Sequence, residues 1–335
     1  MTTTSPAAAA TEITPPRARA MPPPWRLPLA TIAAAFVASL LWPDQLGLVG
    51  RIATTALLVL SLDLLVGYAG IATLGQAALF GVGAYGAGLF AQQVHGDPLL
   101  GLLVAAAAGA CLAAASGAFL LRFEGFTLLM LTIAFAQILL SLASTFRGLT
   151  GGDDGLSDFT VTPILGLWEF DLEGRVGAIY AVTVLAAGLY LSRRVANSPF
   201  GLSIRGIHES RARMAALGTP VRKRLIGIYA LSGMLAGVSG AITAQINGIV
   251  GLDSLGFPLS AEALVMLVLG GAGHLSGSVI GASVFTLLHH TAASIDPYHW
   301  LFVIGIALMA VVLFPPAALA QKVWARVRGA RSTAP

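Results

Sequence analysis

Residues 60–85 read LSLDLLVGYAGIATLGQAALFGVGAY and are the most informative stretch of the chain. They join a long apolar run to a glycine-rich one, and residues 64–94 contain no charged side chain. The apolar residues follow one another instead of recurring at amphipathic spacing, which is typical of a segment surrounded by lipid or by other apolar helices. This stretch therefore predicts membrane-spanning helices that glycines interrupt.

The rest of the chain has the same character. Of its 335 residues, 56% are hydrophobic and 10% are charged, and the mean hydropathy is +0.84. Soluble domains carry about 25% charged residues, so this composition excludes a water-soluble globule. We expect an all-α fold, a polytopic transmembrane helical bundle with about ten spans. The apolar segments lie near residues 27–42, 47–66, 71–92, 98–121, 126–146, 176–192, 225–248, 259–270, 278–294 and 300–316.

The basic residues orient this bundle. If the N terminus is cytoplasmic, all of the 19 Lys and Arg residues except Arg51, Arg147 and Arg175 lie on the cytoplasmic side. This is the bias that the positive-inside rule describes. We predict a multi-pass protein of the inner (plasma) membrane with both termini cytoplasmic. Its expected parts are a disordered cytoplasmic tail (1–26), a transmembrane domain (27–320) and a basic cytoplasmic tail (321–335).

Two connecting segments are long enough to have a function of their own. The external loop, residues 147–175, is acidic and reads either as an ordinary solvated loop or as a docking surface for a solute-binding protein. The cytoplasmic loop, residues 193–224, predicts a short amphipathic helix in which Ser198 is the N-cap, Pro199 the first residue and Gly218 the end. Such a helix lies on the lipid surface or docks into a groove of a partner, and the pattern leaves both readings open.

Small residues recur at four-residue spacing in several of the apolar runs. Spacing of this kind lets helices approach closely in a membrane. Lipid provides no hydrophobic driving force between helices, so their packing depends on close contact at small side chains. The pairs are Ala77 and Gly81, Ala84 and Gly88, Gly233 and Gly237, and Gly277 and Gly281.

Four stretches, in this order, resemble the LivM-type branched-chain amino acid permeases of ABC importers. They are residues 60–85, GGDDGLSDF (151–159), SPFGLSIRGIHESRARMAALGTPVRKRLIGIYALSGMLAGVSGAI (198–242) and LVMLVLGGAGHLSGSVIGA (264–282). The resemblance implies a subunit that moves branched-chain or similar apolar amino acids inward. Its implied partners are a homologous second permease subunit, two cytoplasmic ATP-binding subunits and an extracytoplasmic solute-binding protein. Members that resemble this chain also carry urea or short amides, so that alternative stays open.

The resemblance also implies that the cytoplasmic helix couples the permease to its ATPases. The residues that match the family's coupling segment are Pro199, Gly201, Arg205, Glu209, Ala215 and Gly218. The segment is less basic than is usual in the family, with Leu202 and His208 at positions that are usually basic. The family also usually has Asn where this chain has Ser210 and Asp63.

Two glycine-rich quartets interrupt apolar runs, GYAG at 67–70 and GGAG at 270–273. Broken spans in corresponding halves of a transporter indicate a binding site or a pathway. Asp63 and Glu262 are carboxylates within apolar runs, where a charge is costly. We interpret Asp63 as a neutral acid that hydrogen-bonds to a neighbouring helix. The predicted pathway and break residues are Asp63, Gly67, Tyr68, Gly70, Gly75, Glu262, Gly270, Gly271 and Gly273.

The sequence contains no motif of an enzyme. A P-loop requires Lys followed by Ser or Thr, and neither Lys223 nor Lys322 has that neighbour. The single cysteine, Cys111, and the scattered histidines lead us to expect no metal, no cofactor and no catalytic residue, and no basic face for nucleic acid is present. The rival to the permease is a proton-coupled secondary transporter with Asp63 or Glu262 as its relay. The predicted cytoplasmic helix favours the permease.

Overall fold

The computed structural model describes residues 46–295 apart from 158, 161 and 164–173, together with residues 305 and 309. Both predicted tails, the predicted span at 27–42 and most of that at 300–316 lie outside the described residues. Helices make up the architecture, and in the part of the chain that is described the only β-type pairing is one bridge between Leu156 and Val250. The expected all-α fold is confirmed.

The helices follow the predicted apolar segments closely. In chain order they are α2 (Leu46–Asp63), η2 (Leu64–Tyr68), α3 (Gln76–Gln93), α4 (Pro98–Leu120), α5 (Gly125–Thr145), α6 (Arg147–Thr150), η3 (Gly152–Asp154), α7 (Arg175–Ala196), α8 (Pro199–Glu209), α9 (Arg211–Ala216), α10 (Val221–Asn247), η4 (Leu252–Leu255), α11 (Phe257–Gly270) and α12 (Leu275–Ile295). The first break is a π-helical turn, η2, that continues α2.

Five helices among the described residues are long and apolar enough to cross a membrane. They are α2 with η2, α4, α5, α7 and α10. The pair α11 and α12 adds a sixth if it counts as one span, although its two helices meet at a bend of 116°. The expected span at 71–92 begins later than predicted, because residues 71–75 are not helical and α3 starts at Gln76. The total of about ten crossings stays a prediction.

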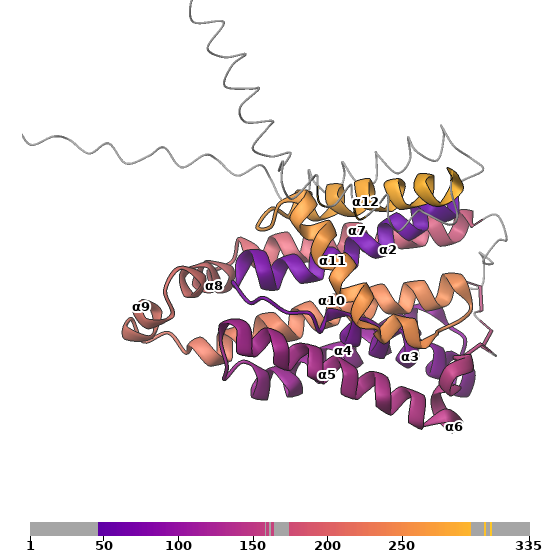
Figure 1. The fold of residues 1–335 in the computed structure, drawn as a ribbon, viewed down its shortest axis with the longest axis horizontal. Helices are drawn as coiled ribbons and strands as arrows, with labels where there is room; N and C mark the ends of the chain where they lie inside the picture. The colour runs from indigo at the N-terminus through magenta and orange to yellow at the C-terminus, as the bar shows by residue number, and fades with distance from the viewer. Residues whose placement is uncertain are drawn as a thin grey trace, which may run out of the picture.

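Helix α10 lies in the middle of the bundle, where it packs against α4, α3 and α2 (Figure 1). Helices α7 and α12 pack on α2, and α4 packs on α3. A polar contact joins three of these helices in the interior, since Gln76 Nε2 donates to Ser61 Oγ (2.7 Å) and to Ser232 Oγ (2.9 Å). Helices α8 and α9 extend from one end of the bundle, and α6 lies at the other (Figure 1).

Glycines bring α10 close to two neighbouring helices. A Cβ atom on Gly83 of α3 would overlap the backbone of Gly237, and one on Gly109 of α4 would overlap the carbonyl oxygen of Gly233. The predicted Gly233 and Gly237 pair therefore lies in a helix contact. Gly81 and Gly88 instead face the side chains of Leu255 and Leu156, which follow α10 and η3. Large apolar side chains such as those of Leu103 and Phe126 are 64% and 74% exposed on α4 and α5, as expected of surfaces that face lipid.

Candidate functional site

The two glycine-rich breaks meet in the structure. The backbone nitrogen of Gly273 donates to Asp63 Oδ1 over 2.7 Å, across 210 residues of sequence. A Cβ atom on Gly67 would overlap the backbone of Gly273, so only glycine allows this approach. Gly70, Gly271 and Gly273 all have positive φ, at 67°, 87° and 84°. Each break thus depends on a backbone conformation that favours glycine.

Asp63 lies at the centre of this contact and is completely buried. One carboxyl oxygen accepts the Gly273 hydrogen bond, and the other, Oδ2, has no hydrogen-bond partner among the described residues. The acid therefore joins α2 to the bend between α11 and α12. This carboxyl accepts one backbone N–H and, within the described part of the chain, contacts no cation. In such a site a neutral acid or an amide costs less desolvation free energy than an ionised carboxylate.

The first break also touches the predicted coupling helix. The Arg205 guanidinium of α8 lies over the Tyr68 ring, with Cζ 4.8 Å from the ring centroid. This is the geometry of a cation–π contact. A Cβ atom on Gly70 would overlap the ring of His208, also on α8. Helix α8, η2 and the second break therefore form one continuous series of contacts.

Helix α8 is attached to the bundle along one face. Ile204 and Ile207 are each 1% exposed and belong to the main hydrophobic core. Ser198 caps the helix by accepting from the Gly201 nitrogen (3.2 Å), and Pro199 is its first residue, as predicted. Gly201 sits so close to the end of α7 that a Cβ atom would overlap the carbonyl oxygens of Val195 and Ala196. A larger residue there would push α8 off α7.

The single helix predicted between Ser198 and Gly218 is wrong in one respect, because it breaks at Ser210. Ser210 has an extended backbone (φ −161°, ψ 105°), which ends α8 at Glu209. Its hydroxyl then accepts from the Arg213 nitrogen (3.3 Å) and starts α9. Serine side chains compete with helix hydrogen bonds in this way, and the amphipathic pattern gives no sign of it.

Helix α9 has no fully buried residue, although Met214 is half-buried and packs against the core beside Gly206 of α8. Ala215 and Leu217 face outward, the latter 73% exposed, and an ion pair between Arg211 and Glu124 ties the helix to the start of α5. Gly218 ends the segment with φ +80° and has nothing within 4 Å of a hypothetical Cβ. The left-handed helix end predicted at Gly218 is therefore observed.

Two of the predicted break residues, Gly270 and Gly75, serve helix packing instead. Gly270 faces Gly277, so that a Cβ atom on either would overlap the backbone of the other, and this holds α11 against α12. Gly75 lies beside Thr132 of α5, with a hypothetical Cβ 3.1 Å from its carbonyl oxygen. Gly271 has open space beside it.

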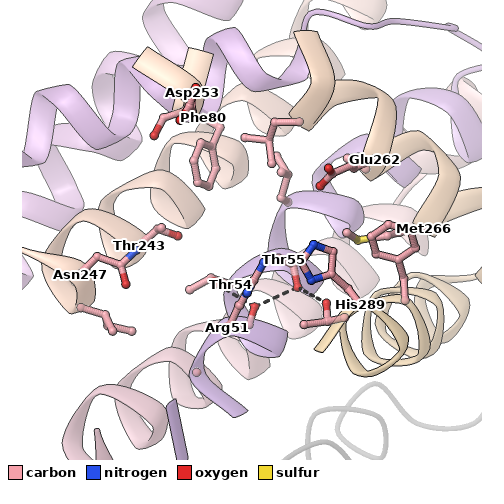
Figure 2. A pocket seen from close by; sticks show the side chains of 18 of the residues that line it. Arg51, Thr54, Thr55, Phe80, Thr243, Asn247, Asp253, Glu262, Met266 and His289 are labelled. Carbon is pink, nitrogen blue, oxygen red and sulfur yellow. Dashed lines mark hydrogen bonds between the residues drawn. The ribbon is translucent and has the colours of Figure 1, made fainter. Parts of the chain in front are cut away.

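Glu262 lies apart from both breaks, in a cavity of about 450 Å³ lined by α2, α3, α10, η4, α11 and α12 (Figure 2). Arg51 of α2 and His289 of α12 line the same cavity, as do Asn247 and Asp253 at the end of α10 and in η4. All these residues lie toward the end of the bundle opposite α8 and α9. The charge distribution along the sequence placed Arg51 only on the non-cytoplasmic side, although Thr54 and Thr55, three and four residues later, mark a polar face on an apolar helix.

Comparison with known proteins agrees with this architecture. The family model described as the permease component of branched-chain amino acid transport systems matches residues 46–312. The LivM high-affinity branched-chain amino acid permease protein of Escherichia coli K12 is 26% identical over 320 residues, covering 86% of this chain and 74% of LivM. Its counterpart in Salmonella typhimurium LT2 is 27% identical, covering 78% of this chain and 67% of that protein.

Sugar permeases also match, over less of the chain. The ribose import permease protein RbsC of Bacillus subtilis 168 is 28% identical, covering 57% of this chain and 54% of RbsC. No solved structure matches the chain. The family match extends over most of the sequence and includes both breaks, α8 and the cavity. The chain therefore belongs to the family of branched-chain amino acid transport system permease components, the membrane-spanning subunits of ABC transporters.

Proposed function

We propose that this subunit moves branched-chain or similar apolar amino acids inward, with separate ATP-hydrolysing subunits as the energy source. The observation that carries the proposal is the series of contacts from α8 through Tyr68 and Gly70 to Gly67 and Gly273. A force applied to α8 from the cytoplasm acts directly on the π-helical turn η2 and on the bend between α11 and α12. Among the described residues these are the only π-helical turn and the only sharp bend between two paired helices. The breaks are where the bundle bends most easily.

The partners follow from this role. Two ATP-binding subunits would contact α8 and α9, whose exposed face carries Leu202, Glu209 and Leu217. A second, homologous permease subunit would complete the pathway, and a solute-binding protein would deliver the solute at the opposite end. There the external loop is tied to the residues after α10 by the Leu156 and Val250 bridge.

Transport by the purified complex tests the proposal. The tagged full-length chain is isolated from its native membrane with its partners and reconstituted into vesicles. We expect leucine uptake that requires ATP and persists in the presence of a protonophore. Uptake that collapses with the protonophore and ignores ATP would instead favour the proton-coupled transporter, with Asp63 or Glu262 as its relay. ATP-driven uptake of urea or ribose without leucine would contradict the assigned solute class.

Cysteine labelling tests the orientation. In a Cys111→Ser background, Asp154→Cys, in η3, and Ala215→Cys, in α9, place thiols at opposite ends of the bundle. A membrane-impermeant maleimide added to intact cells should label the first variant and spare the second. Labelling of position 154 only from the cytoplasmic side would reverse the assigned topology.

A further inference from the structure

The cavity beside Glu262 has the form of a small-molecule site. Its volume of about 450 Å³ lies within the range of known ligand pockets. Its walls come from α2, from Phe80 of α3 and from the consecutive elements α10, η4, α11 and α12, and it lies between the end of the bundle remote from α8 and the two breaks. Figure 2 shows the side chains of Arg51, Glu262, His289 and Met266 around one space.

The cavity is lined by one arginine, Arg51, and by two carboxylates, Glu262 and Asp253. Arg51 stands on α2 and Glu262 on α11, and both side chains are exposed. Among the described residues, neither side chain forms an ion pair or a hydrogen bond with the other or with a third group. Arg51 and Glu262 attract each other across the cavity without direct contact, so a ligand that fits between them can bond to both.

The deeper wall of the cavity is apolar. Leu58 lies two turns further along α2 than Arg51, Met266 lies one turn beyond Glu262 on α11, and Phe285 lies one turn below His289 on α12. On all three helices the polar residue is therefore nearer the open end, and the apolar residue is nearer the breaks. Thr55 lies between the two levels, where its hydroxyl meets that of Thr286 at 3.3 Å.

We propose that this cavity binds the transported solute as a zwitterionic α-amino acid. The carboxylate of the solute lies at Arg51, its ammonium at Glu262, and its apolar side chain against Leu58, Met266 and Phe285. The reason is charge matching, because an amino acid carries one charge of each sign and can form a direct charge-assisted hydrogen bond with Arg51 and with Glu262 at the same time. Urea and sugars carry no charge and would form neither ion pair. The inference rests on the proposed function and adds to it the position and the recognition chemistry of the solute.

Protection of a cysteine from alkylation tests the site. The full-length chain carries Cys111→Ser with Asn247→Cys, an exposed position in the lining of the cavity, and a matched control carries Ser144→Cys, on α5 outside it. The probes are leucine, leucinamide (no carboxylate), 4-methylpentanoate (no ammonium), urea and ribose. We expect leucine to slow alkylation at position 247 at least threefold and to leave position 144 unchanged, and each of the other compounds to protect less at equal concentration.

Charge-removing variants assign the two ends of the solute. Arg51→Gln should raise the leucine concentration needed for half protection about tenfold, and Arg51→Lys should restore part of it, as removal of a charge-assisted hydrogen bond predicts. Arg51→Gln should leave protection by leucinamide unchanged, and Glu262→Gln should leave that by 4-methylpentanoate unchanged. Thermal unfolding of each variant in detergent serves as the folding control.

The outcomes separate this proposal from the proposed function. Leucine that is transported by the assembled complex but fails to protect position 247 would overturn the cavity site and leave the function standing. Protection by urea or ribose equal to that by leucine, or protection that neither charge-removing variant changes, would also overturn it. ATP-driven transport of urea or ribose alone would contradict the proposed function itself.

Discussion

Helices α8 and α9 are consecutive parts of one amphipathic segment, yet they contact the molecule in different ways. Helix α8 buries Ile204 and Ile207 in the core and lays Arg205 over Tyr68. Helix α9 buries no residue, and its ion pair between Arg211 and Glu124 is with the start of α5. The two helices therefore differ in attachment: α8 is fixed to the first break, whereas α9 packs Met214 against the core and leaves Ala215 and the following Leu217 exposed. A groove in a partner is thus the better of the two readings of this segment.

The largest difference in stability between variants of α8 and α9 should appear when valine replaces a small residue on each helix. Gly201→Val forces a branched side chain into the backbone of Val195 and Ala196, whereas Ala212→Val adds it to an exposed position of α9. We expect Gly201→Val to lower stability by about 1–3 kcal/mol and abolish transport. Ala212→Val should cost only the helix propensity difference, about 0.5 kcal/mol. Thermal unfolding in detergent measures both, and equal midpoints would contradict the assignment of α8 as the attached helix.

Substitutions at the exposed positions of the segment should affect the coupling of transport to ATP hydrolysis without affecting insertion of the chain into the membrane. Gly218→Pro cannot adopt the φ of +80° and loses the hydrogen bond from the Gly218 nitrogen to Ala215 (2.9 Å). Glu209→Ala removes an exposed carboxylate at the end of α8. We expect both variants to reach the membrane at normal levels. The ratio of solute transported to ATP hydrolysed should fall more than about tenfold, which corresponds to a loss of about 1.4 kcal/mol or more in coupling free energy. Gly218→Ala is the milder control. Normal transport in both variants would show that the partner does not act here.

The contact between α8 and the break should have an intermediate effect. Arg205→Ala removes the cation over Tyr68, which is worth about 0.5–2 kcal/mol, and should reduce transport by about 3- to 30-fold while ATP hydrolysis continues. Arg213→Ala, on the exposed face of α9, is the matched control in the same segment. The pair is read as the ratio of leucine taken up to ATP hydrolysed. A larger fall of this ratio in Arg213→Ala than in Arg205→Ala would show that α9, and not α8, transmits the force.

The smallest effect is expected at Asp63, at the inner end of the same contacts. In Asp63→Asn the amide oxygen still accepts from the Gly273 nitrogen, so transport should stay within about twofold of the parent. Asp63→Leu removes the acceptor and leaves a buried N–H unpaired at a cost of about 1–3 kcal/mol. Uptake and expression are measured together. Abolished uptake in Asp63→Asn with intact expression would support a proton relay.

Much of the architecture is readable from sequence because lipid imposes a simple rule. Backbone groups in an apolar environment must satisfy one another, so long apolar runs become helices, and α4, α5, α7 and α10 begin and end close to the predicted segments. Local signals were equally reliable where one residue decides the conformation, as at Ser198, Pro199 and Gly218. Ser210 was missed because whether a mid-helix serine bonds outward or caps a new helix depends on what surrounds it.

The sequence by itself determined the fold class, the glycine breaks and the helix that follows Ser198, because each depends on composition or on a local backbone preference. Only the tertiary structure decided that Gly67 lies against Gly273, that Arg205 stacks on Tyr68, and that Arg51 shares a cavity with Glu262. These residues come from segments separated by more than a hundred positions. Their meeting depends on how close the helices approach and at what angle they cross, which the packing of all the small side chains sets together.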